Sequence, residues 1–313
     1  MCYSAQVVAS YERFVREFGA ILDIHEFVQL FVRKRADGGW ARLPKGMRDA
    51  FRRPQGEAGF ELAKLVAEGD RELEAALEAE LAAQEQRHAK AESVLASPKP
   101  TKKAVEDKRI ASNKIKAARR NLDDLRRQSP DPKDSRIYPG SFAPVMIRDP
   151  KALARTVVPM RYQCRLPGWT EAIERKYPGT YNARRDKLEE TWFQLFGHQH
   201  GIMIVSKFYE NVDRGGENVV LEFTPDPPQD MLIACLWSKT RNKDGADLWS
   251  FAAITDEPPA EVIAAGHDRC IIPIKPENLD AWLNPNPGDL AACYAILDDR
   301  PRPYYAHRVD KAA

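Results

Sequence analysis

Residue 2 of the chain is a cysteine, and this position gives it two reactive groups. Initiator methionine is removed efficiently only before a small residue, so Met1 is expected to be lost and Cys2 to become the N-terminus. An α-amine titrates near ~8 and a thiol near ~8.5, so both reach nucleophilic forms close to neutral pH. Together they can condense with an aldehyde, first as a Schiff base and then as a five-membered thiazolidine. Alone, the thiolate can act as an acyl-transfer nucleophile. A cysteine placed there only by the start of translation is the third interpretation.

Two polar residues near position 180 suit the binding of an anion. Asn182 stands just before a stretch that predicts a helix over Ala183–Phe196, and Arg184 lies at its start, so Asn182 fits the N-cap of that helix. The guanidinium of Arg184 can hold a phosphate through two parallel hydrogen bonds, or it can pair with Asp186 or Glu190.

Two further residues suit proton transfer. Glu210 follows an apolar stretch that predicts a strand, and a partly buried carboxylate at such a position can move protons. His267 lies between a glycine and an aspartate before another predicted strand, where an imidazole can serve as acid or base. His198 and His200 resemble part of a zinc site, but no third ligand group accompanies them, so no metal and no cofactor is expected.

Composition limits the setting in which this chemistry can occur. The chain has 313 residues, enough for one large or two ordinary domains, and its net charge is only +2, so nucleic-acid binding would need a local patch. No apolar run is long enough to span a membrane, and nothing resembles a signal peptide. Five widely spaced cysteines form no CxxC pair, which argues against a disulfide framework and favours a reducing cytoplasm.

A helical hairpin is predicted in the first half of the chain. Residues 11–32 predict one helix broken near Gly19 or two short ones. Glu57–Leu95 carries ten acidic and four basic residues, whereas Thr101–Arg127 carries ten basic and four acidic ones, and Pro98 and Pro100 separate them. These arms predict an antiparallel pair with complementary faces. A solvated, salt-bridged face is favoured over DNA binding by the basic arm, whose predicted apolar stripe consists of Val105, Ala111, Ile115, Leu122 and Leu125.

From Ile137 onward, short strands separated by proline and glycine predict an α+β fold. The predicted strands are Gly201–Lys207, Val219–Thr224, Ile233–Trp237, Ser250–Ile254 and Asp268–Ile274. Short helices are predicted between Pro259 and Gly266 and over Pro276–Leu283.

Taken together with an N-terminal cysteine, these motifs and their order resemble one family, the SOS-response-associated peptidases (SRAP), whose members cross-link to abasic sites in DNA. The similarity covers residues 1 to about 35 and about 136 to 300. It rests on Met1-Cys2, Phe142-Ala143-Pro144, Pro159-Met160-Arg161-Tyr162, Pro167-Gly168-Trp169, Tyr181-Asn182-Ala183-Arg184, Phe208-Tyr209-Glu210, Leu236-Trp237, Phe251-Ala252-Ala253-Ile254-Thr255 and Gly266-His267-Asp268-Arg269.

The resemblance implies a role for each matched residue. Cys2 would form a thiazolidine with the ring-opened sugar of an abasic site in single-stranded DNA, and Asn182 would position the reacting centre. Glu210 would shuttle protons, and His267 would assist ring opening and stabilise the adduct. Binding of the DNA is implied for Arg184 at a phosphate, for Pro144 and Trp169 as wedge and stacking platform, and for Arg161.

The chain departs from the family pattern at several positions. Tyr3-Ser4 follows Cys2 where Gly-Arg is usual, which removes an expected phosphate-binding arginine. Asn211 replaces a tryptophan after the Tyr-Glu pair, Cys270 a methionine after Arg269, and Tyr162 a tryptophan. These changes affect contacts with DNA more than the proposed chemistry.

These observations predict an SRAP-like open barrel of mainly antiparallel strands with flanking helices. Residues 1–45 and 136–313 would form the catalytic domain, and residues 46–135 a helical insertion that binds an unidentified protein. The predicted function is cross-linking of abasic single-stranded DNA, with loss of Met1 by autoproteolysis, in the cytoplasm and at the nucleoid when bound to DNA. The alternatives are an N-terminal-nucleophile amidohydrolase or cysteine peptidase and a noncatalytic nucleic-acid-binding module.

Overall fold

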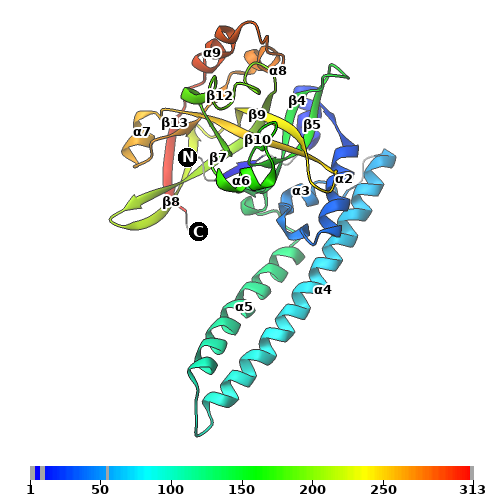
Figure 1. Ribbon diagram of the computed structural model, residues 1–313, viewed down its shortest axis with the longest axis vertical. Helices are drawn as coiled ribbons and strands as arrows, with labels where there is room; N and C mark the ends of the chain where they lie inside the picture. The colour runs from blue at the N-terminus through cyan, green and yellow to red at the C-terminus, as the bar shows by residue number, and fades with distance from the viewer. Residues whose placement is uncertain (1–3, 8–10, 54–55, 311–313) are drawn as a thin grey trace. The chain divides into compact units, whose positions relative to one another are not determined.

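The structure is a computed structural model that describes residues 4–7, 11–53 and 56–310 (Figure 1). The chain forms two compact units. One comprises the described residues up to Leu30, Arg42–Ala50 and the chain from Pro132 onward, and the other comprises Phe31–Ala41 and Phe51–Asp131. The predicted α+β fold class with an inserted helical hairpin is confirmed. Within the described residues, no helix combines the length and the apolar character needed to cross a membrane.

A ring of five strands forms the centre of the first unit. The strands are β4 (Phe142–Arg148), β5 (Arg155–Tyr162), β7 (His200–Arg214), β9 (Met231–Arg241) and β10 (Asp247–Asp256). Antiparallel pairs join β5 to β4, β4 to β7, β7 to β9 and β9 to β10. A short parallel pairing of β10 with β5 closes the ring. The predicted barrel of mainly antiparallel strands is therefore present, and its sheet returns to its starting strand.

The barrel interior is apolar because alternate residues of each strand point to the same face. Buried side chains two positions apart fill it, namely Ala143, Val145 and Ile147, Val158, Met160 and Tyr162, Met203 and Val205, Ile233 and Cys235, and Phe251 and Ala253.

Shorter strands extend this sheet. β1 (Ser4–Val7) pairs with β7 and with β3 (Arg136–Ile137), and β8 (Glu217–Asp226) lies between β7 and β13 (Tyr304–Val309). The remaining short strands are β2 (Ile21–Leu22) on β5, β6 (Asn182–Arg184) and β11 (Cys270–Ile271) on β10, and β12 (Pro273–Ile274) on β9. Four of the five predicted strands lie within these elements, whereas the fifth, Asp268–Ile274, is strand only at β11 and β12.

Short helices accompany the strands. They are α1 (Tyr11–Phe18), α3 (Lys45–Asp49), α6 (Glu171–Lys176), α7 (Ala260–Ala264), α8 (Leu279–Leu283) and α9 (Leu290–Asp298), with 3₁₀ turns η2 (Pro132–Ser135), η3 (Arg185–Lys187) and η4 (Pro276–Asn278). The predicted break near Gly19 is confirmed, because Gly19 adopts a φ of 59° after α1 and the chain resumes as α2 (Ile24–Ala36). The 3₁₀ turn η1 (Trp40–Arg42) follows α2.

The helix predicted over Ala183–Phe196 is wrong. Asn182–Arg184 forms β6, which pairs in parallel with Ala253–Thr255 of β10, and only the 3₁₀ turn η3 follows it. The backbone of this segment forms hydrogen bonds with a strand some seventy residues away instead of within a helix. A pattern in the local sequence cannot reveal such a distant pairing. Asn182 is consequently a strand residue and not an N-cap.

The hairpin of the second unit consists of α4 (Gly56–Leu95) and α5 (Lys102–Arg126), side by side and antiparallel (Figure 1). Thr101 caps α5, since its hydroxyl accepts a hydrogen bond from the Ala104 nitrogen at 3.1 Å. Complementary charges join the arms as predicted, through Arg126 with Glu74, Lys114 with Glu80, Arg119 with Glu85, Lys108 with Glu92, and Arg87 with Asp107.

The apolar stripe of α5 differs from the predicted one. Val105 is 58% exposed, and the buried positions are Ala104, Ala111, Ala118, Leu122 and Leu125. Three alanines at seven-residue intervals keep one face of α5 small, so that α4 can approach closely.

His200, at the start of β7, is a structural residue. Its Nε2 accepts a hydrogen bond from the Gly197 nitrogen at 2.8 Å, and its Nδ1 lies 3.1 Å from the Trp282 carbonyl oxygen. Its ring stacks on Trp282 with centroids 3.9 Å apart. Burial lowers the pKa of His200 from 6.5 to about 3. Since both ring nitrogens already have backbone partners, His200 is unsuited to bind zinc.

This burial makes stability depend on pH. Between the unfolded pKa of about 6.5 and the folded pKa of about 3, the unfolded chain binds a proton at His200 and the folded chain does not, so the free energy of unfolding falls as pH falls. We expect His200→Gln to lose up to ~1.4 kcal/mol per pH unit of that slope. Urea titrations from pH 7 to pH 4 measure it, with the exposed neighbour His198→Gln as control. An unchanged slope in His200→Gln would contradict this account.

Candidate functional site

Two titratable side chains meet beside strand β7. The Nε2 of His267 lies 3.3 Å from the Oε2 of Glu210. The Glu210 side chain has no exposed surface, and the His267 side chain is 8% exposed. Gly266, which precedes the histidine, has a φ of 100°, and a Cβ there would lie 3.2 Å from a methyl group of Val212 on β7. A glycine therefore lets the loop approach the strand closely enough to place His267 on Glu210.

The contact between these two groups must contain a proton, because two lone pairs facing each other would repel. The Nδ1 of His267 lies 2.8 Å from the carbonyl oxygen of Arg269 and 3.3 Å from the Arg269 nitrogen. If Nδ1 donates to that carbonyl oxygen, Nδ1 holds the proton of the neutral imidazole, and the proton between Nε2 and Oε2 is an additional one. If Nδ1 instead accepts from the Arg269 nitrogen, the imidazole proton is on Nε2 and lies between Nε2 and Oε2. Burial lowers the pKa of His267, so the imidazole readily gives up a proton. This pair can therefore store one proton and release it.

The N-terminal strand lies next to this pair. Ser4 pairs with Tyr209 in the register of β1 on β7, and Tyr209 immediately precedes Glu210. Arg136 of β3 holds both strands, since its Nε donates to the Ser4 hydroxyl at 3.1 Å and its guanidinium lies 3.6 Å above the Tyr209 ring. Cys2 and Met1 lie outside the described residues. No motif in the sequence marks Arg136, and only the register of three strands reveals its role.

Asn182 offers hydrogen-bonding groups that the described protein does not use. It is 6% exposed, and neither its Nδ2 nor its Oδ1 has a hydrogen-bond partner among the described residues. A buried amide without partners is costly, by ~1–3 kcal/mol for each unsatisfied group. Such an amide is suited to a ligand that supplies the missing partners.

Arg184 is paired in this structure. Its Nε and a terminal nitrogen lie 2.9 and 2.6 Å from the two carboxylate oxygens of Asp186, and both side chains are about half exposed. Hydrogen bonding to Asp186 raises the pKa of Arg184, and the charge of Asp268 adds to this effect. The carboxyl pKa of Asp186 is lowered chiefly by Arg184 and to a lesser extent by Arg269. The pair therefore lies close to the loop that carries His267.

Two of the residues predicted to bind DNA are occupied or covered. Arg161 donates to the Gln163 carbonyl oxygen at 3.0 Å and also pairs with Glu174, which is 3% exposed and receives a second arginine, Arg165, at 2.9 Å. Pro144 is buried opposite Pro159 in the pairing of β4 with β5, so little of its ring is available as a wedge. The predicted contacts of these two residues with DNA would need a rearrangement.

Trp169 lies on an accessible aromatic surface. The Trp169 nitrogen donates to the Leu166 carbonyl oxygen at 3.0 Å, and Gly168 has a φ of 78° after Pro167, which is a type II turn. Its ring centroid is 5.3 Å from that of Tyr177, which is 59% exposed. These two rings offer the kind of surface on which an unpaired base stacks.

The other cysteines are unsuited to nucleophilic chemistry. Cys164, Cys235, Cys270 and Cys293 are all buried, and burial raises the pKa of each thiol, that of Cys164 to about 12. Any thiol chemistry is therefore left to Cys2. Among the described residues, no cluster of His, Cys, Asp and Glu is arranged to hold a metal ion.

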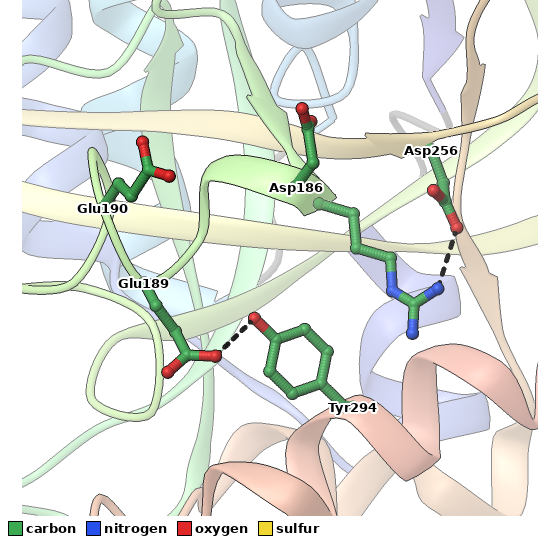
Figure 2. A pocket seen from close by; sticks show the side chains of 6 residues that line it. Asp186, Glu189, Glu190, Asp256 and Tyr294 are labelled. Carbon is green, nitrogen blue, oxygen red and sulfur yellow. Dashed lines mark hydrogen bonds and ion pairs between the residues drawn. The ribbon is translucent and has the colours of Figure 1, made fainter.

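An acidic cavity borders η3. Its volume is about 480 Å³, and its lining is Arg185, Asp186, Glu189, Glu190, Asp256 and Tyr294. The Tyr294 hydroxyl donates a hydrogen bond to Glu189 at 3.0 Å (Figure 2). Arg185 donates one to Asp256 at 3.3 Å. Four carboxylates around one arginine repel a phosphate. A nucleic-acid strand is therefore disfavoured at this cavity.

The fold and site define a barrel protein with a buried Glu–His pair beside its N-terminal strand. The family model described as SOS response associated peptidase (SRAP) matches residues 101–312, which is more than half of the chain, so the chain belongs to this family. Membership associates the protein with the response to DNA damage. The comparison with curated proteins found no match.

Several solved structures are similar in fold. A protein from Bordetella bronchiseptica is 21% identical, with a TM-score of 0.46 over 56% of this chain and 87% of its own. A protein from Bacteroides thetaiotaomicron is 15% identical, with a TM-score of 0.46 over 56% and 77%. A phage-related protein from Bordetella bronchiseptica is 18% identical, with a TM-score of 0.44 over 60% and 86%.

The Arg184–Asp186 pair leads to a prediction about anion binding. If Arg184 binds a phosphate, Asp186 competes with it, and Asp186→Asn should tighten binding of single-stranded DNA by about two- to five-fold, the worth of an exposed ion pair. Glu190→Gln removes the same charge from the same cavity without touching Arg184 and is the control. Filter binding across a salt series measures both. Equal gains in the two variants, or the same gain when Arg184 is also alanine, would show that Asp186 acts only through net charge.

Proposed function

We propose that the protein forms a covalent thiazolidine between its processed N-terminal Cys2 and the aldehyde of an abasic site in single-stranded DNA. The observation that carries this proposal is the buried Glu210–His267 pair, 3.3 Å apart, beside the strand that begins at Ser4. Position 2 precedes Ser4 by two residues in the sequence, and Ser4 pairs with Tyr209, the neighbour of Glu210. Buried thiols elsewhere and membership of the SRAP family also support it.

The reaction balances without a cofactor. The α-amine adds to the aldehyde carbon of the ring-opened sugar, and the resulting carbinolamine loses water to give an imine. The thiolate then adds to the imine carbon, and the nitrogen takes up a proton. The net change is aldehyde plus amine plus thiol to thiazolidine plus one water, with no oxidation or reduction. Two steps move a proton near the nitrogen, and the Glu210–His267 pair is suited to supply and accept it.

The other predicted residues have roles in binding. Asn182 would direct its unused amide at the reacting sugar, and Arg184 would exchange Asp186 for a flanking phosphate. Trp169 with Tyr177 would stack an unpaired base. Arg161 and Pro144 remain predicted contacts with DNA. Arg161 would first have to leave Glu174, and the pairing of β4 with β5 around Pro144 would have to open.

An N-terminal-nucleophile amidohydrolase is the competing function, and one observation favours it. The unpartnered Nδ2 of Asn182 would also serve as a donor to the oxyanion of an acyl-transfer reaction. In that case the Cys2 thiolate attacks a carbonyl, and Met1 would be removed by the protein itself. The phosphate-binding role of Arg184 distinguishes the two, since an amide substrate has no phosphate.

The first prediction of this proposal concerns maturation. The active protein should lack Met1, because the thiazolidine needs a free amine and a thiol on the same residue. Intact mass before and after incubation with abasic single-stranded DNA measures this directly. Cys2→Ser should form no stable adduct, because an oxazolidine is more labile, and Cys2→Ala should form only a transient imine. Full activity in a species that retains Met1 would exclude the mechanism.

A second prediction concerns the proton. Glu210→Gln should leave binding of abasic DNA nearly unchanged and slow adduct formation by ~10²-fold or more, because the carboxamide cannot shuttle a proton. Denaturing-gel kinetics measure the rate, and Glu222→Gln, which replaces a buried carboxylate opposite Tyr209 on β8, is the matched control. If both variants slow the reaction equally, the effect of Glu210 is structural. If the wild type forms no adduct and Arg184→Ala leaves the salt dependence of binding unchanged, a screen of small amides should replace the DNA assay.

A further inference from the structure

Positive charge gathers where the two arms of the hairpin join. We call residues 87–109 the hairpin tip, and this segment has seven Lys and Arg against three Asp and Glu. The surplus is four positive charges in a chain whose net charge is +2. Lys90, Lys99, Lys102 and Lys103 are all exposed. None of these four makes an ion pair with another described residue, so the surplus faces solvent.

The rest of the hairpin is different. Along its middle and base, cations of α5 pair with acids of α4, as Lys114 does with Glu80 and Arg126 with Glu74 and Glu78. The acids of α4 that face α5 are therefore used within the hairpin. Lys90, Lys99, Lys102 and Lys103 of the tip form no such pair with another described residue.

The acidic residues of the hairpin tip do not neutralise its surplus of positive charge. Asp107 accepts a hydrogen bond from Arg87 at 2.5 Å, and its pKa is lowered chiefly by Arg87 and further by Lys103 and Lys90. One carboxylate is thus shared by three cations. Glu92 is likewise held by Lys108 at 2.9 Å.

The lysine positions do not serve the stability of the helix. Lys102 and Lys103 occupy the first turn of α5, which has no acidic residue. Cations in the first turn oppose the helix dipole, and clustered like charges repel. A local arrangement that costs stability and has no compensation within the fold indicates an external partner.

We propose that the hairpin tip binds the sugar–phosphate backbone of DNA, as a second contact besides the reactive site. DNA is favoured over a lipid surface because residues 87–109 contain no aromatic side chain that could enter a membrane interface. The choice of DNA as the polyanion rests on the proposed function. Lysines act there as point charges on phosphates, so the contact is independent of base sequence.

The test compares two variants of the full-length chain. Lys99, Lys102 and Lys103 are changed to Gln in the tip variant, and Lys64, Lys151 and Lys243, all exposed and distant in sequence, are changed to Gln in the control. Both lose three charges. Binding to fluorescent duplex and single-stranded DNA without abasic sites is measured by anisotropy across a salt series, after circular dichroism has confirmed folding.

The tip variant should bind DNA more weakly at low salt, by about ten-fold or more. The slope of log Kobs against log salt is negative, and its magnitude should decrease by up to ~2.7 for duplex DNA or ~2 for single strands. The control should fall by clearly less. The strand type with the larger loss identifies the form of DNA that the tip prefers. Equal losses of DNA affinity in both variants, or no loss in the tip variant, would overturn the proposal. An acidic protein surface would then be the partner of these lysines.

The two proposals can fail separately. Cross-linking is measured on the same variants with abasic single-stranded DNA at a saturating protein concentration, where weaker binding no longer limits the yield. If the wild type forms no adduct but the tip variant loses DNA affinity, the proposed chemistry fails and the tip proposal stands. If adducts form normally and the tip variant binds intact DNA like the control, only the tip proposal fails.

Discussion

A carboxylate without any exposed surface, on the central strand of the sheet, constrains the site. Removing Glu210 from water costs several kcal/mol unless a partner compensates, and the 3.3 Å contact with His267 is that compensation. The need for this contact explains Gly266, whose φ of 100° brings the loop against β7. The same loop carries Asp268 and Arg269, whose charges reach Arg184 and Asp186 on the neighbouring strand segment. One buried acid therefore draws together segments from three distant parts of the chain.

The arginines and lysines fall into two groups according to how they are neutralised. Arg161 and Arg165 share the buried Glu174, so these two arginines contribute to the fold. Arg184 pairs with an exposed carboxylate that water and phosphate can displace, and Lys90, Lys99, Lys102 and Lys103 of the tip form no ion pair with another described residue. Since an exposed pair contributes ~1 kcal/mol or less, the second group can exchange partners at little cost. Anion binding is accordingly proposed for Arg184 and the exposed tip lysines.

The sequence predicted the elements whose signal is local. Three of the five barrel strands, β7, β9 and β10, were predicted from short apolar runs separated by proline and glycine, whereas β4 and β5 were not predicted. The hairpin was predicted because its two arms have opposite charge. The helix over Ala183–Phe196 was wrong because β6 takes its hydrogen bonds from β10, and Val105 was misplaced because small alanines set the contact between the arms. Glu210 and His267 were each predicted to act as acid–base residues. Their contact, and the role of Arg136 on Ser4 and Tyr209, depend on strand register and could not be read from spacing.

The unused amide of Asn182 connects the geometry of the fold with its chemistry. Strand β6 is short and parallel to β10, which presents Asn182 without offering its side chain any partner among the described residues. Because an unsatisfied buried amide destabilises the free protein, a ligand that satisfies it recovers that free energy on binding. A ring-opened abasic sugar within a DNA strand keeps one free hydroxyl, at C4′, and a hydroxyl can accept a hydrogen bond from Nδ2 or donate one to Oδ1, whereas an oxyanion can use only the Nδ2 donor. The presence of both an unused donor and an unused acceptor therefore suits a ligand that carries a hydroxyl group, as the proposed sugar aldehyde does.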